Sequence, residues 1–363
     1  MKTQIYILIL FCAFFVSCGN PLKELEVAST PAELRALWQS HEQLIKDYTA
    51  QARDFREVMF ARVRALPQHA SDPDTRFLRQ KLQEQLQQRP VHYNFIVVPD
   101  LSMRISREHY PRNFRQDTEV IEMVLDIFLE KVQTRYFGHK DRIVLRPTDL
   151  QQVPDFSRYA PALSIDFSGV DVADSRQFID ELPRNKQQFM NAVREMYQEV
   201  ASNGHRGADI WKFFDEDLDQ ALVLPSTDSD SIRNVLVLVT DGYLEADKYG
   251  AAYCQQNRCE YLSNLRIQKF RRQVLRSGMR WDEYFEARDF GITPVHKPGR
   301  LAGLEVICLE FYDRFPKKQP SDYQITRKFW EKWFADMGLR AMVDKTRESP
   351  EDTRKRVVQF LEN

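Results

Sequence analysis

The sequence predicts an α/β fold, with a doubly wound, mostly parallel sheet, an antiparallel edge strand and a preceding α-helical hairpin. Several segments are short, continuously apolar and rich in β-branched residues, which is typical of strands buried on both faces of a sheet. Helical patterns lie between these segments. Their alternation indicates parallel strands that are joined by crossover helices.

Composition narrows the class of protein. The chain has 363 residues, and 43% of them are hydrophobic, which is enough for a sizeable core and excludes wholesale disorder. The 52 basic and 53 acidic residues give a formal net charge of -1. Proteins that neutralise nucleic-acid phosphates usually have a clear basic excess, so we do not expect nucleic-acid binding.

Residues 1–17 have the layout of a secretory signal peptide. Lys2 precedes the apolar run 5–16, which is shorter than the ~20 apolar residues of a membrane-spanning helix. The run ends in Phe-Val-Ser-Cys-Gly, which resembles a bacterial lipobox with Phe15 in the place of the more familiar leucine. The resemblance implies lipidation of Cys18. An ordinary signal peptide with an incidental cysteine is the alternative.

A lipidated Cys18 implies that acyl chains anchor the protein to a bacterial membrane, with residues 18–29 as a tether. We therefore expect the rest of the chain in the cell envelope. No acidic run follows Cys18, which favours a periplasm-facing position. Disulfides persist in such a compartment. Cys254 and Cys259 share one polar segment and could close a small loop.

Residues 30–89 are expected to form an α-helical hairpin or coiled coil. Thr30-Pro31 supplies a helix cap and a proline at the first helical position, and apolar residues then recur on a seven-residue repeat up to Pro67. A second helix is predicted after Pro73. The pair is either an antiparallel hairpin that lifts the main domain from the membrane or a coiled coil that binds a partner.

The α/β domain is predicted for residues 90–345, and a further helix for 346–363. Strands are expected at 93–99, 141–146, 234–240 and 304–311, with an edge strand at 163–167. Helices are expected at 118–132, 184–200 and 209–222, and a last aromatic-rich helix ends at Gly338.

The interval 243–303 is too long for an unstructured loop. Because it directly follows a strand end, we expect it to lie over the site face of the sheet. It is either an insertion that shapes ligand choice or occludes the site, or a helical subdomain that only extends the core.

Polar residues follow two of the predicted strands. Asp100 and Ser102 come after strand 93–99, and Asp241 follows strand 234–240. Ligands of open α/β sheets bind beyond the carboxyl ends of the strands, so we expect these side chains to converge. A third loop carries Asp209 in front of a helix. Carboxylate and hydroxyl oxygens suit Mg²⁺, Ca²⁺ or Mn²⁺ rather than Zn²⁺.

These motifs and the order of the predicted strands resemble a von Willebrand factor type A domain over roughly residues 90–340. That family carries a metal-ion-dependent adhesion site built from Asp-x-Ser-x-Ser, a distant Thr and a distant Asp. The resemblance implies metal ligands at Asp100, Ser102 and Asp241, with Asp209 in the place usually held by Thr. It also implies a divalent cation that accepts a carboxylate from a partner.

Arg104 departs from the family pattern, because it stands where the second serine is expected. A guanidinium has no acceptor and cannot ligate a cation. Arg104 either points away and leaves the other four residues to hold a metal with waters, or replaces the metal by bridging Asp100 and Asp241. A vestigial site is the third outcome.

The sequence thus favours a non-catalytic, membrane-anchored binding protein of the cell envelope, whose partner is another protein or an envelope component. Gly-x-Ser-x-Gly, His-Glu-x-x-His and P-loop motifs are absent. One alternative is a metal-dependent, phosphatase-like hydrolase with Asp100 or Ser102 as the nucleophile. The other is a structural scaffold in which the front helices form the interaction surface.

Overall fold

The computed structural model describes most of the chain as two compact units. One unit contains the residues up to Val91 together with 226–231, and the other contains 92–225 and 232–363. The predicted signal peptide and Cys18 lie outside the described residues. The described ranges are 21–46, 50–67, 72–88, 90–105, 111–133, 140–150, 153–170, 175–203, 207–219, 221–227, 230–245, 250–314, 318–345 and 349–363.

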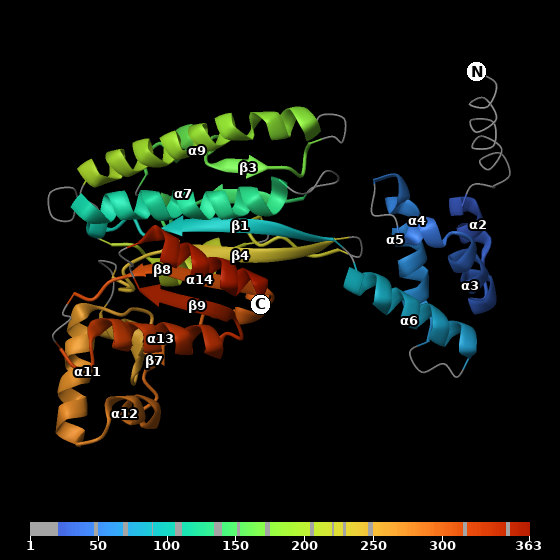
Figure 1. Ribbon diagram of the computed structural model, residues 1–363. Helices are drawn as coiled ribbons and strands as arrows, with labels where there is room; N and C mark the ends of the chain where they lie inside the picture. The colour runs from blue at the N-terminus through green and yellow to red at the C-terminus, as the bar shows by residue number, and fades with distance from the viewer. Residues whose placement is uncertain are drawn as a thin grey trace. The chain divides into compact units, whose positions relative to one another are not determined.

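The first unit is helical. Thr30 caps one of its helices by accepting a hydrogen bond from the main-chain N–H of Glu33 at 3.3 Å, as its sequence predicts. Apolar residues of the predicted seven-residue repeat, Trp38, Ile45 and Met59, are buried in its core. Its helices are α2 (Pro21–Val27), α3 (Pro31–Ser40), α4 (Glu42–Lys46), α5 (Ala50–Ala65) and α6 (Pro73–Gln88) (Figure 1).

The helices of this unit are shorter than predicted. The helix expected from Pro31 onwards is interrupted at His41, between α3 and α4, and the segment expected to be a tether contains α2. Arg62 lies among the apolar positions of α5 and donates hydrogen bonds to the main-chain carbonyls of Leu25 and Ala28. These carbonyls belong to the end of α2, so Arg62 satisfies acceptors that have no partner within the helix.

The second unit contains a six-stranded sheet. Strands β1 and β2 pair in parallel, as do β4 with β8 and β8 with β9, while β3 pairs antiparallel with β2. The predicted α/β class, the mostly parallel sheet and the antiparallel edge strand are therefore confirmed. The strand order is β3 (Ser164–Asp166), β2 (Arg142–Leu145), β1 (Val91–Pro99), β4 (Ser231–Val239), β8 (Leu304–Phe311), β9 (Arg340–Lys345).

Strand β9 has no counterpart among the predicted strands. It is a six-residue edge strand with charged residues at both ends, and only Val343 and Asp344 of it are buried. A half-exposed edge strand lacks the continuous apolar run that marks a central strand. The pattern on which the other strands were predicted is therefore missing at this position.

Helices cover both faces of the sheet (Figure 1). Phe95 and Val97 of β1 point into a core formed with α7 (Pro111–Gln133), α9 (Ser175–Asn203) and α14 (Pro350–Glu362). The alternate residues Ile96 and Val98 point into a second core, which contains α13 (Asp322–Asp336) and α10 (Ile210–Lys212) with its π-helical continuation Phe213–Asp217. Short helical segments lie at Met103–Ile105 and Phe156–Tyr159.

The interval 243–303 forms a folded insertion. Phe285 packs edge-on against Phe329 of α13 at a centroid distance of 4.9 Å, so the insertion extends the second core. It contains α11 (Asn264–Ser277), α12 (Trp281–Ala287), short helical turns at Ala251–Tyr253 and Pro298–Leu301, and a small sheet of β5 (Cys254–Gln255), β6 (Arg258–Cys259) and β7 (Gly291–Ile292).

Candidate functional site

A cavity of about 230 Å³ opens at the carboxyl ends of β1 and β4. These strands are neighbours, and the chain continues from β1 to β2 on one side and from β4 to β8 on the other, so the strand order reverses here. Ligands of open α/β sheets bind at such a point. The residues that line the cavity are Asp100, Ser102, Arg104, Asn113, Ala208, Asp241, Tyr243, Glu245, Tyr312 and Arg314.

Asp100 brings a buried carboxylate to this cavity. Its side chain accepts hydrogen bonds from the hydroxyl of Thr240 at 2.8 Å and from the main-chain N–H of Ser102 at 3.1 Å. Burial raises the pKa of Asp100 to about 6; the charge of Arg104 opposes this shift and that of Asp241 reinforces it. Among the described residues no cationic side chain is hydrogen-bonded to this carboxylate.

Asp241, in contrast, has a cationic partner. Arg314 donates a hydrogen bond from Nη2 to Asp241 at 2.8 Å and one from Nη1 to Glu245 at 3.2 Å. The guanidinium carbon of Arg314 lies 3.7 Å from the centroid of the Tyr243 ring. Burial opposes the charge of Arg314, but Asp241 outweighs it, and the pKa of Arg314 is raised. Arg314 therefore neutralises Asp241 from the loop after β8.

Gly242 lets the chain turn away directly behind Asp241. Its φ is +87°, and a Cβ atom would lie 2.8 Å from the ring of Phe311. Its carbonyl accepts a hydrogen bond from Trp330 Nε1 at 2.8 Å. The position of the Asp241 side chain is thus set by a turn that only glycine adopts without strain.

Arg104 does not bridge Asp100 and Asp241, which corrects that expectation. Its guanidinium makes a bidentate pair with Asp117 of α7, at 2.5 and 2.9 Å. The hydroxyl of Tyr197 on α9 donates to the same carboxylate at 3.3 Å. Arg104, Asp117 and Tyr197 are all buried, and burial opposes the charge of Arg104 while Asp117 raises its pKa. Arg104 thus points from the cavity wall towards α7.

Asp209 has a local structural role. Its side chain accepts a hydrogen bond from the main-chain N–H of Lys212 at 3.0 Å and so caps α10. Its neighbour Ala208 lines the cavity. Of the four residues predicted as metal ligands, the described lining of the cavity thus includes Asp100, Ser102 and Asp241.

The carboxylates predicted as ligands of a divalent cation have other partners in this arrangement. A metal such as Mg²⁺ needs oxygen ligands that are free to coordinate it. One carboxylate of the pair is held by Arg314, and the other accepts hydrogen bonds from Thr240 and Ser102. Within the part of the chain that the structure describes, no group of three or more His, Cys, Asp or Glu side chains is suited to hold a metal ion.

Arg314 and Asp117 are site residues that sequence reasoning missed. Arg314 follows strand β8 by three residues, and β8 is a parallel neighbour of β4. The rule that singles out Asp100 and Asp241, namely proximity to a strand's carboxyl end, applies to Arg314 as well. Asp117 carries no such signal, because it lies within the first turns of helix α7.

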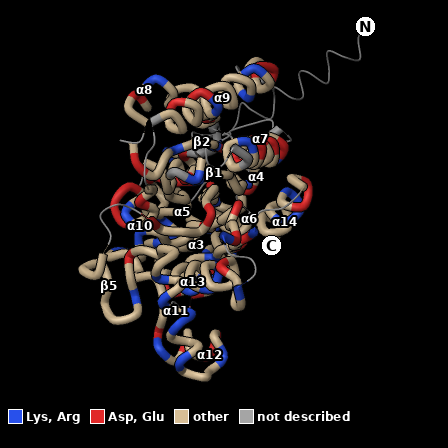
Figure 2. Tube along the Cα trace, turned by 90° about the vertical axis from the view of Figure 1, so that its left-hand side faces the viewer, with Lys and Arg blue, Asp and Glu red and all other residues tan. Residues whose placement is uncertain are grey.

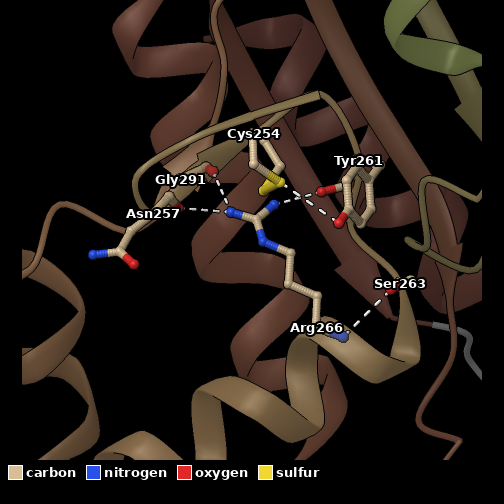
Figure 3. Close-up of a disulfide and its surroundings, with 7 residues drawn as sticks. Cys254, Asn257, Tyr261, Ser263, Arg266 and Gly291 are labelled. Carbon is tan, nitrogen blue, oxygen red and sulfur yellow. Dashed lines mark hydrogen bonds between the residues drawn. A yellow bond between two sulfur atoms is a disulfide. The ribbon is translucent and has the colours of Figure 1, made fainter. Parts of the chain in front are cut away.

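The insertion contains a disulfide between Cys254 and Cys259, which closes the β5–β6 hairpin (Figure 3). Cys308 is a free, buried cysteine on β8, and burial raises the pKa of its thiol. Cys308 therefore behaves as a core residue. The lipidation predicted at Cys18 lies outside the described residues.

Comparison with models of known families, with curated proteins and with solved structures finds no match for this chain. The von Willebrand factor type A assignment stays a prediction from the motifs. None of the helices in the described ranges is long and apolar enough to cross a membrane.

Proposed function

We propose that this chain is a membrane-anchored binding protein of the bacterial cell envelope, whose α/β unit binds another protein or an envelope component at the cavity between β1 and β4. The observation that carries the proposal is the carboxylate of Asp100. It is 2% exposed, lines the cavity and has no hydrogen-bonded cation among the described residues. A buried charge without a partner is unfavourable, and a ligand of opposite charge relieves this.

The charges of the cavity indicate which group the partner supplies. Asp100, Asp241 and Glu245 line it, and Arg314 pairs with the last two. The charge of Arg104 is balanced by Asp117. A positively charged group of the partner, such as an ammonium or guanidinium, therefore complements the site. In this proposal the partner's own cation takes the role that a metal has in the family that the sequence resembles.

The anchor is the second part of the proposal. The lipobox-like segment before Gly19 supports acylation of Cys18, and several acyl chains on one residue give a stable attachment to the membrane. Binding at the α/β unit then holds the partner near that membrane.

Affinity capture of the full-length protein from its own membranes tests the proposed site. We expect a partner that is retained by the unmodified protein and lost with Asp100→Asn, which removes the charge and keeps the shape. Asp209→Asn is the matched control, because asparagine also caps a helix and Asp209 does not line the cavity. Capture at pH 5 should be weaker than at pH 7.5, since Asp100 has a pKa of about 6. Equal capture by both variants contradicts the site.

Calorimetric titration with Mg²⁺ and Mn²⁺ separates this proposal from a metal site. We expect no saturable binding by the unmodified protein, because Arg314 holds Asp241. Tight binding of either ion by the unmodified protein, abolished in Asp241→Ala, would establish a resident cation instead.

A further inference from the structure

The insertion carries a second cavity, of about 740 Å³. Its volume is within the range of small-molecule sites. Leu244, Phe270 and Phe290 give it an apolar wall, and the β5–β6 hairpin and α11 provide the polar side. This cavity lies away from the residues that carry the proposed function, apart from Glu245, which lines both.

Arg266 of α11 supplies an inner positive charge to this second cavity (Figure 3). Its guanidinium donates hydrogen bonds to the main-chain carbonyls of Asn257 at 2.7 Å, Gly291 at 2.8 Å and Tyr261. Its central carbon lies 4.9 Å from the centroid of the Phe329 ring. A guanidinium has five N–H groups, so these three bonds leave two.

No acidic side chain among the described residues pairs with Arg266. Glu245 lines the same cavity, but its carboxylate accepts from the main-chain N–H of Asn264 at 3.0 Å and from Arg314. Burial lowers the pKa of Arg266 to about 10.

Arg258, on the neighbouring strand β6, shows the opposite case. It forms ion pairs with Asp289 and Asp336 at 2.7 Å each, and its pKa is raised. The two arginines differ in their partners, because Arg266 has carbonyl dipoles where Arg258 has carboxylates. A charge held by dipoles alone still attracts a counterion.

We infer that this cavity binds an organic monoanion, namely a carboxylate carried on an apolar body, with Arg266 as its counterion. One inner positive charge is balanced by one negative charge, and the apolar wall accommodates the rest of the molecule. Lys269 adds a second, exposed positive charge to the lining. Helix α11 contains several basic and no acidic residues, as Figure 2 illustrates, so the approach to the cavity favours anions.

Titration of the full chain with 3-phenylpropionate, followed by calorimetry, tests this inference. The neutral amide of the same acid has the same shape and is the ligand control. We expect saturable binding of the carboxylate and at least roughly tenfold weaker binding of the amide, because a hydrogen bond to a charged group is lost. Inorganic phosphate should bind more weakly than the carboxylate. Equal binding of acid and amide, no saturable binding of the acid, or a preference for phosphate overturns the assignment.

Variants of α11 locate the binding. We expect Arg266→Gln to abolish binding of the carboxylate and Lys269→Gln to weaken it about threefold. Arg272→Gln is the matched control, because Arg272 is an exposed basic residue of the same helix that lines a different surface groove. Arg266 also donates a hydrogen bond to the hairpin, so Arg266→Gln can destabilise the insertion as well as remove the charge. Arg266→Lys, which keeps the charge, and Lys269→Gln, which changes an exposed residue, test the location without this complication. An effect of Arg272→Gln as large as that of Lys269→Gln overturns the location.

Asp100→Asn should leave carboxylate binding unchanged. The test of this cavity and the test of the proposed function can therefore fail independently of each other.

Discussion

The two cavities of the α/β unit differ in the sign of the charge that is left without a partner. At the carboxyl edge of the sheet, Arg104 pairs with Asp117 and Arg314 with Asp241, and the carboxylate of Asp100 remains. In the insertion, the hydrogen bonds of the Arg266 guanidinium to described residues all go to main-chain carbonyls. In each cavity, the ligand that we propose complements the charge that remains after internal pairing, not the full set of charged residues nearby.

Removal of an arginine should cost most where the arginine and its carboxylate partner are both buried, as in the pair of Arg104 with Asp117. Arg104→Met leaves Asp117 buried without a counterion, and we expect a loss of about 4 kcal/mol in the free energy of unfolding. Arg266→Met leaves neutral carbonyls, for which we expect about 2 kcal/mol. Urea unfolding of the full chain measures both. The double variant Arg104→Met, Asp117→Leu should recover most of the loss, and equal losses for the two single variants would remove the distinction between the cavities.

The charge of Asp100 should make stability depend on pH. Its folded-state pKa of about 6 lies above the ordinary value of 3.8, so the protein is stabilised below pH 4 and loses this contribution as the pH rises through 6. The free energy of unfolding of Asp100→Asn should therefore exceed that of the unmodified protein by roughly 3 kcal/mol at pH 8. At pH 4 the two proteins should be about equally stable. Thermal unfolding at both pH values tests this. A variant that is less stable at pH 8 would show that the charge has a partner.

Reduction of the Cys254–Cys259 disulfide should affect the insertion cavity alone. Asn257, whose carbonyl binds Arg266, lies between the two cysteines. A loop this short constrains the unfolded chain by about 2 kcal/mol. We expect faster amide exchange in the hairpin and weaker carboxylate binding in the Cys254→Ser, Cys259→Ser variant, with unchanged partner capture at the sheet edge. A loss of partner capture would show that the two cavities are coupled.

Loss of Arg314 should have the smallest effect on stability. Its side chain is 33% exposed, so the pair with Asp241 contributes about 1 kcal/mol or less. Arg314→Gln leaves Asp241 without its cation, and we expect Mg²⁺ binding by calorimetry to increase from none to measurable. Unchanged titration curves would indicate that Arg314 is not what excludes the metal.

Central strands were predictable because their residues are apolar on both faces, and β1, β4 and β8 lie within a few residues of the expected positions. Edge strand β9 was not, because half of its surface faces solvent. The continuous helix expected before Pro67 was wrong for a related reason. Its apolar repeat describes a core-facing stripe, and such a stripe continues across the break between α3 and α4.

The candidate site shows a similar division. The convergence of Asp100, Ser102 and Asp241 followed from the positions of two strand ends, which are local features of the chain. The partner of Arg104 did not follow, because Asp117 is one of several acidic residues in α7 and only the packing of this helix brings it to the cavity wall. The same holds for the carbonyl partners of Arg266. Arg314, in contrast, follows the end of β8 by three residues, so the strand-end rule could have found it.

The α/β class, the sheet edge at which polar residues gather and the segment in which a disulfide forms could all be predicted from the amino-acid sequence. These properties depend on hydrophobic periodicity and on residues that are close along the chain. Which charges are neutralised depends on contacts between residues that are far apart in the sequence. Packing decides which carboxylates and carbonyls lie within hydrogen-bonding distance of each guanidinium. Among the described residues, the charges without a hydrogen-bonded group of opposite charge are Asp100 in one cavity and Arg266 in the other, and only the folded chain reveals them.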